Sequence, residues 1–280
     1  MVLFGAAWPV TKLAVGHGAG PAWFALGRAG LSCAAATAMV GAAGRLRVPG
    51  RADMPALLAV GLLQLAGFFA LGHLALALVP AGRAAVLSNA TGVWIVPLSL
   101  LLGERVSPRQ LVAAGLGLLG VAALVGPWGG AGGAGREALL GDLLLLGAAL
   151  SWALAMAALR RRPPAMTMLE LLPWSFGVAT LALLPLALLR PAGRWDGTGW
   201  AALLLIGLVA GPGGTWCVMQ ASRLLPMVVA STGFLGAPAV GVLLSAAWLG
   251  EALTPGLLLG SALILGGVAA AALPGRRRPA

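Results

Sequence analysis

Five polar side chains inside long apolar stretches are the residues best suited to do chemistry in this chain. They are Lys12, Arg28, Gln64, His73 and Asn89. A charged or hydrogen-bonding group is costly within a membrane and usually marks the path of a substrate or ion. A buried cation attracts an anionic group such as a carboxylate, whereas an imidazole or amide hydrogen-bonds to a polar solute.

The same five residues also have a structural interpretation. The long side chains of Lys12 and Arg28 can extend to the membrane surface. His73 and Gln64 can bond neighbouring helices, and Asn89 can bond its own helix backbone. The sequence leaves both interpretations open.

Two tryptophans, Trp94 and Trp216, complete the set of predicted substrate-binding residues. An aromatic face can wall a cavity for a cationic or aromatic solute, or it can pack between helices. Cys33 and Cys217 have no cysteine neighbours and the two histidines are far apart. The sequence therefore predicts no metal site and no bound cofactor.

Three prolines within apolar stretches predict hinges. Pro97 and Pro238 occupy corresponding stretches of the two halves, and Pro212 lies in the run Gly-Pro-Gly-Gly at 211–214. A proline inside a helix removes one hydrogen bond and bends the backbone. Paired helix interruptions in the two halves of a membrane protein point to a site near the middle of the membrane.

Composition determines the elements that must hold these residues. The chain has 280 residues, 60% hydrophobic and 9% charged, with a mean hydropathy of +0.98. Soluble domains are about 45–50% apolar and about 25% charged, so a soluble protein is excluded. The expected fold is an all-α polytopic membrane protein with no second, water-soluble domain. Its ten predicted segments are residues 2–15, 22–44, 55–79, 83–102, 109–125, 138–159, 168–189, 199–221, 227–249 and 255–273.

Basic residues between the segments predict the orientation. Twelve arginines fall on one set of alternate loops and tails, and four (Arg83, Arg136, Arg190 and Arg194) fall on the other. Positive residues favour the cytoplasmic side of a membrane. The chain is therefore expected to be a multi-pass protein of the inner membrane, with both termini in the cytoplasm. The net charge of +11 is scattered among apolar runs, which argues against binding of nucleic acid. No cleavable signal peptide is expected, and the sequence does not decide whether the N-terminus is truncated.

Carboxylates are predicted only in loops or near helix ends. The seven are Asp53, Glu104, Glu137, Asp142, Glu170, Asp196 and Glu251. Proton-coupled carriers often place such a group in the middle of the membrane. The sequence thus gives no support for coupling through a carboxylate, and Glu104 and Glu251 are interpreted as loop anchors.

An internal repeat organises the ten segments. The hexapeptide GERVSP at 103–108 is echoed by GEALTP at 250–255, and LGVAA at 119–123 is echoed by GGVAA at 266–270. Two halves, 1–130 and 131–280, then contain five segments each. An odd number places the halves in opposite orientations, as in transporters built from inverted repeats.

With these motifs in order, the chain resembles the EamA-type family of drug/metabolite transporters over nearly its whole length. The matching stretches are WPVTK at 8–12, residues 21–28, Gly103–Arg105 with Gln110 and Gly115, residues 141–152, and Gly250-Glu251. The resemblance implies a ten-helix fold with a central cavity lined by helices 1–4 and 6–9. It also implies secondary transport of small metabolites such as amino acids, purines or drugs.

The predicted function is secondary transport, in the direction of efflux, of a small amphipathic metabolite such as an amino acid, by alternating access. An uncoupled facilitator or a multidrug exporter of the same fold is the alternative. An intramembrane enzyme would need facing acid/base groups or metal ligands at membrane depth, and a receptor or scaffold would need large loops. The expected partners are a small-molecule substrate and the lipid bilayer, and the sequence allows a homodimer.

Overall fold

The computed structural model describes residues 2–104, 106–126, 135–214, 217 and 227–272, with the backbone alone at 227–235 and 271–272. Helices joined by short loops make up these ranges. The first half contains α1 (Val2–Gly16), α2 (Pro21–Ala42), α3 (Met54–Leu58), η1 (Ala59–Gly67), α4 (Phe68–Leu76), α5 (Ala81–Leu87), α6 (Thr91–Leu101) and α7 (Pro108–Val125). The second contains α8 (Arg136–Arg161), α9 (Met168–Leu188), α10 (Gly197–Leu204), η3 (Leu205–Ala210), α12 (Met227–Leu249) and α13 (Pro255–Ala272).

Length and hydropathy make this a multi-pass membrane protein. In the described ranges, seven helical stretches are long and apolar enough to cross a membrane, and three shorter apolar helices are Val2–Gly16, Gly236–Leu249 and Pro255–Ala270. About 20 apolar residues are needed for a full span. The expected number of ten spans and their inverted order therefore stay predictions.

Helix ends follow from local sequence. Ser107 and Thr167 each cap a helix, with Gln110 and Glu170 completing reciprocal capping boxes at α7 and α9. The two Gly-Glu motifs mark helix ends as well. Gly103 and Gly250 follow α6 and α12 with φ of 72° and 66°, a left-handed conformation that glycine adopts at no steric cost.

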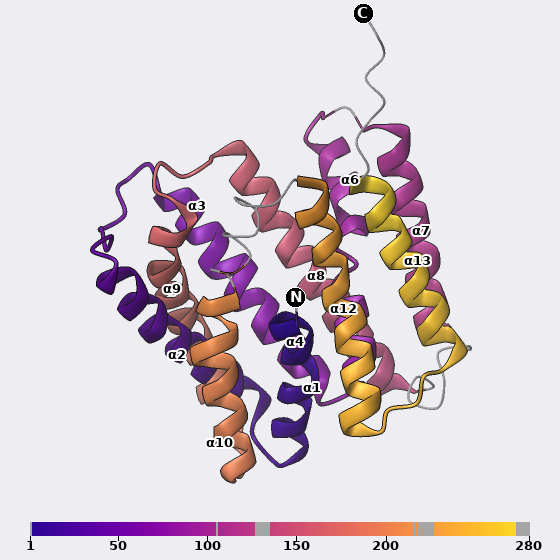
Figure 1. Ribbon diagram of the computed structural model, residues 1–280, viewed down its shortest axis with the longest axis horizontal. Coiled ribbons are helices and arrows are strands. Elements are labelled where there is room, and N and C mark those ends of the chain that lie inside the picture. The colour runs from indigo at the N-terminus through magenta and orange to yellow at the C-terminus, as the bar shows by residue number, and fades with distance from the viewer. Residues whose placement is uncertain (1, 105, 127–134, 215–216, 218–226, 273–280) are drawn as a thin grey trace, which may run out of the picture.

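The helices pair across the two halves of the chain. In Figure 1, α7 and α13 lie side by side at one edge of the bundle, and α2 and α9 pack together at the opposite edge. Between these edges α1 packs on α12, and α8 packs on η1 and α4. Lipid tails are as apolar as the helix surfaces, so the hydrophobic effect does not drive membrane helices together. Small residues at the contacts let the helices approach closely and pack instead.

Two π-helical stretches occupy matching places in the halves. η1 follows α3 and η3 follows α10, and a glycine is the third residue of each: Gly61 and Gly207. A methyl group on Gly61 would lie 2.7 Å from the Val178 side chain, and one on Gly207 would lie 2.7 Å from that of Leu31. Val178 and Leu31 are each the eleventh residue of their helix, α9 and α2. The two contacts thus repeat the same geometry with the halves exchanged.

The predicted segment at 83–102 is broken at residues 88–90 and not at Pro97, which lies inside α6. The Asn89 Nδ2 and the Ser88 hydroxyl both donate to the Ala85 carbonyl, at 2.7 and 3.3 Å. Such side chains compete with the regular backbone hydrogen bonds of a helix. The interruption expected in this segment is present, but it occurs at Ser88 and Asn89 and not at Pro97.

The interruption predicted around Pro212 is also present. η3 ends at Ala210, Gly211 forms a turn, and helical residues resume at 212–214. Pro238 lies buried within the continuous helix α12. The hinge roles of Pro97, Pro212 and Pro238 stay predictions.

Candidate functional site

Two aromatic–polar pairs on neighbouring helices form the candidate site. Phe24 and Arg28 lie four residues apart on α2, and Phe69 and His73 lie four residues apart on α4. Residues with this spacing share one helix face. The two faces meet, because the Arg28 guanidinium lies 4.2 Å from the centre of the Phe69 ring and the Phe24 and His73 rings are 5.7 Å apart. We call these four residues the Arg28–His73 cluster.

His73 is fixed by one hydrogen bond and leaves the other ring nitrogen unpaired. It is 4% exposed, and its Nδ1 lies 2.6 Å from the Phe69 carbonyl oxygen. A carbonyl only accepts, so Nδ1 carries the proton and Nε2 of a neutral ring is an acceptor. This Nε2 is enclosed and has no hydrogen-bond partner.

Arg28 is a cation without an anionic partner in the described residues. Its Nε is enclosed and lacks a hydrogen bond, although the residue as a whole is only partly buried. The flat guanidinium on Phe69 is a cation–π contact, which compensates part of the cost of burying the charge.

Two further buried oxygens are unpaired. The Thr11 hydroxyl oxygen on α1 and the Gln64 Oε1 on η1 are both enclosed without a partner. Thr11 lies three residues after Trp8, whose indole covers Gly72 beside His73. Thr11 therefore shares the face of α1 that packs on α4.

Lys12, predicted to bind substrate, holds a loop in this conformation. Its Nζ donates to the carbonyls of Leu76 and Val79, at 2.6 and 3.0 Å. Leu76 is the last residue of α4 and Val79 lies just after it, and carbonyls at a helix C-terminus attract a cation. We call residues 77–80, between α4 and α5, the α4–α5 linker.

Glu251 holds the other end of this linker. Its Oε1 and Oε2 accept from the backbone amides of Ala81 and Gly82, at 2.6 and 2.8 Å, where α5 begins. A carboxylate is stabilised by free amides at a helix start. The anchoring role predicted for Glu251 is thereby confirmed.

The assignment of Arg83 to an outer loop is wrong. Arg83 lies in α5, is 4% exposed, and donates from Nε and Nη2 to Asp142 on α8 at 2.7 and 2.5 Å. Asp142 is near the start of its helix as predicted, but it is 1% exposed. A bidentate pair can keep both charges buried because each satisfies the other.

The remaining predicted residues lie apart from the Arg28–His73 cluster or outside the described ranges. Asn89 is exposed and donates to the Ala85 carbonyl of the preceding helix, α5. The Trp94 Nε1 donates to the Leu146 carbonyl on α8 at 3.0 Å, a helix-packing contact. Trp216 lies outside the described residues.

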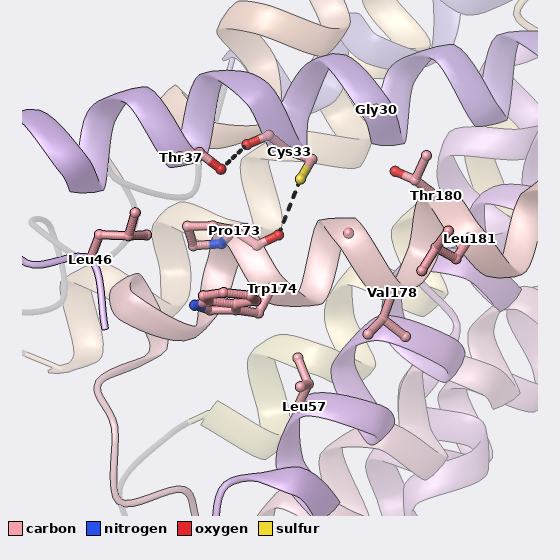
Figure 2. Close-up of a pocket in the computed structure, with 11 residues that line it drawn as sticks. Gly30, Cys33, Thr37, Leu46, Leu57, Pro173, Trp174, Val178, Thr180 and Leu181 are labelled. Carbon is pink, nitrogen blue, oxygen red and sulfur yellow. Dashed lines mark hydrogen bonds between the residues drawn. The ribbon is translucent and has the colours of Figure 1, made fainter. Parts of the chain in front are cut away.

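A large apolar groove lies elsewhere, between α2 and α9. Its volume is 630 Å³, and Cys33 and Thr37 of α2 and Pro173 and Trp174 of α9 are among its lining residues. Figure 2 shows the Cys33 thiol donating to the Pro173 carbonyl, at 3.4 Å. None of the predicted substrate-binding residues that the structure describes lines it. Leu181, one of its lining residues, is 72% exposed. The apolar lining and this exposure fit contact with lipid chains better than recognition of a polar solute.

Asp53, which precedes α3, joins the start of that helix to the segment between α8 and α9. Its carboxylate accepts from the amides of Ala165 and Met166 at 2.8 and 2.9 Å and from that of Gly50 at 3.1 Å. The Met166 amide lowers the pKa of Asp53 most, with further lowering by Gly50 and Ala165, against a raising effect of desolvation.

Sequence reasoning identified Arg28 and His73 but missed their aromatic partners, the Arg83–Asp142 pair and Thr11. The spacing of four in Phe24/Arg28 and in Phe69/His73 is the signal that could have linked the aromatic residues to the site. The other contacts join residues far apart in sequence. No spacing rule could predict those.

The model of the EamA-like transporter family matches residues 1–126 and 139–273. An uncharacterized transporter of Archaeoglobus fulgidus is 30% identical over 191 residues, which are 66% of this chain. The match spans 64% of that relative's length.

A solved crystal structure has the same fold. It superposes with a TM-score of 0.65 at 24% sequence identity, and the match covers 96% of this chain and 93% of that one.

Proposed function

Because the chain belongs to the EamA-like transporter family, we propose that it is a secondary transporter of a small amphipathic metabolite such as an amino acid. It works by alternating access in an inner membrane, with both termini in the cytoplasm and with efflux as the physiological direction. The observation that carries the proposal is the pair of π-helical stretches, each with a glycine that receives the eleventh residue of a helix from the other half.

Support for two inverted halves, 1–130 and 131–280, comes from pairing between them. α7 packs on α13, and α2 packs on α9, so corresponding helices meet each other. Gly61 of the first half contacts Val178 of the second, and Gly207 of the second half contacts the equivalent residue of the first, Leu31. In an inverted repeat the two ends of the central pathway are built from equivalent parts, which allows one to open as the other closes.

In this proposal the α4–α5 linker closes one end of the central pathway. Lys12 of α1 binds the carbonyls at the start of the linker, and Glu251, which follows α12, binds the amides just after its end. The linker is therefore attached to both α1 and α12. This is the end assigned to the outside by the arginine distribution. Both contacts must break for the outer end to open.

The equivalent acid at the other end makes different contacts. Glu104 and Glu251 follow the equivalent glycines, and their amides bond the Ser99 and Ser245 carbonyls at 2.8 and 3.4 Å. The Glu104 carboxylate, however, accepts from the Ser99 hydroxyl at 2.8 Å and lies 3.6 Å from an Arg160 nitrogen. The two Gly-Glu turns therefore hold different groups: the Glu251 carboxylate binds the amides that begin α5, and the Glu104 carboxylate binds the Ser99 hydroxyl beside Arg160.

Reconstitution tests the proposal. Purified protein in liposomes is given labelled amino acids, purines and cationic dyes, one at a time, with protein-free liposomes as the control. We expect saturable flux of at least one solute. A monodisperse protein that moves none of them would contradict transport.

A pH gradient across the same liposomes separates a coupled carrier from an uncoupled facilitator. We expect accumulation above equilibrium when the gradient is imposed, and equilibration alone would indicate a facilitator. His73→Gln identifies the coupling group: pH dependence retained in full would exclude His73.

A further inference from the structure

We propose that the Arg28–His73 cluster binds the carboxylate of the transported solute, with Arg28 as its counter-charge and His73 accepting a hydrogen bond from the solute. The inference rests on the proposed transport function and narrows its substrate to small organic acids that carry an N–H or O–H near the carboxylate.

The first step is that the protein supplies no anion for Arg28. Six of the seven acidic side chains are held by other groups: Asp53, Glu104, Asp142, Glu170, Asp196 and Glu251. The seventh, Glu137, is exposed in the first turn of α8. The residues outside the described ranges include no Asp or Glu. No acidic side chain is therefore left over as a counter-ion for Arg28.

The second step is the cost of this arrangement. A partly buried charge with an enclosed, unpaired Nε is unfavourable, and the Phe69 ring offsets only part of that cost. By contrast, Arg83 in the same protein is buried with a bidentate carboxylate. A guanidinium matches the two oxygens of a carboxylate in the same way, so a solute carboxylate would complete at Arg28 what Asp142 completes at Arg83.

The third step concerns His73. Its Nδ1 proton is used by the Phe69 carbonyl, which leaves Nε2 as an enclosed acceptor without a donor. The His73 ring centre is 5.7 Å from that of Phe69, the ring that also carries Arg28 at 4.2 Å. A small solute whose donor lies a few bonds from its carboxylate has the size to bond both groups once the enclosed cluster opens during transport.

The fourth step is the apolar surround. Phe24 lies between His73 and Trp195, with ring centres 5.7 and 6.2 Å away. On the α1 side, Trp8 covers Gly72. Such walls suit the apolar part of an amphipathic acid and would disfavour a sugar or a multiply charged ion.

The test compares acids with their amides in proteoliposomes of the full chain. Labelled amino acids, the matching amino-acid amides and adenine are supplied to wild type, Arg28→Gln, Arg28→Lys and the control Arg194→Gln in an exposed loop. We expect wild type and Arg194→Gln to transport at least one acid at least tenfold faster than its amide. Arg28→Gln should lose that preference, and Arg28→Lys should keep part of it because the charge remains.

The outcomes separate this inference from the proposed function. Equal transport of acids and amides by wild type, or a preference that survives in Arg28→Gln, overturns carboxylate binding at Arg28 while transport stands. Flux of adenine without flux of any acid does the same. Absence of all flux defeats the transport proposal itself. Size-exclusion profiles report whether Arg28→Gln folds. If it does not, the acid-to-amide preference of wild type and its partial retention in Arg28→Lys decide the test.

Discussion

At the scale of single residues, two arginines of the described ranges contrast: the buried Arg83 has a carboxylate partner, whereas Arg28 has none. The buried Arg83–Asp142 pair joins α5 to α8, with both side chains almost fully enclosed. Removing one partner of such a pair leaves an uncompensated charge, which costs about 3–5 kcal/mol. We therefore expect Asp142→Asn to lower the free energy of unfolding by about that much, measured by denaturation in detergent micelles.

The matched control is Glu137→Gln, an exposed acid of the same helix, which should change stability little. The double variant Arg83→Leu/Asp142→Leu should recover much of the loss, since no charge stays unpaired. A single variant as stable as wild type would contradict the importance of the pair.

Asp53 gives a pH-dependent prediction. Backbone amides, that of Met166 foremost, hold the pKa of Asp53 below its usual value, so folding favours the ionised carboxylate. This stabilisation is complete above the ordinary aspartate pKa of about 3.9 and is lost as the pH falls through the lower pKa of the folded state. Thermal unfolding should place Asp53→Asn below wild type at pH 7, with the difference shrinking below about pH 4. A difference that grew on acidification would have the wrong sign.

At the scale of helices, close contacts at small residues fix the bundle. An alanine at Gly61 would collide with Val178, and one at Gly207 with Leu31. Overpacking of this kind costs about 1–3 kcal/mol. We expect Gly61→Ala and Gly207→Ala each to reduce thermal stability. Val178→Gly and Leu31→Gly should restore part of it, each in its own pair, because the Cβ of Val178 and of Leu31 lies 2.7 Å from the added methyl group and alanine would keep it.

The crossed combinations, Gly61→Ala with Leu31→Gly and Gly207→Ala with Val178→Gly, serve as controls. Their effects should add without rescue, since the residues are not in contact. Rescue in the crossed pairs, or none in the matched pairs, would contradict the exchanged contacts.

The helices themselves were predictable from hydropathy, because an apolar run long enough to span a membrane has few alternatives to a helix. The π-helical geometry at Ala59–Gly67 and Leu205–Ala210 was not, since it depends on the helices packed against the two glycines. The break at 88–90 instead of Pro97 had a local signal in Ser88 and Asn89. Arg83 was misassigned because a basic residue near a segment end resembles a loop residue until its partner 59 positions away is known.

At the scale of the whole molecule, the account requires the two ends to open in turn. Glu251→Ala removes one fastening of the α4–α5 linker and should favour opening of that end, whereas Glu104→Ala should not. A cysteine at Thr11, in a Cys33→Ser/Cys217→Ser background, reports access through labelling by an impermeant maleimide. We expect Glu251→Ala to raise labelling from the outer face several-fold. Equal effects of the two variants from that face would contradict the assignment.

Counterflow tests the central claim, transport by alternating access, most directly. Liposomes containing purified protein are loaded with the unlabelled solute of highest flux and diluted into a trace of the same labelled solute. A carrier with one site reached from each side in turn must show transient accumulation of label above its equilibrium level. A monotonic rise to equilibrium, as through a pore, or no entry of label would contradict the account.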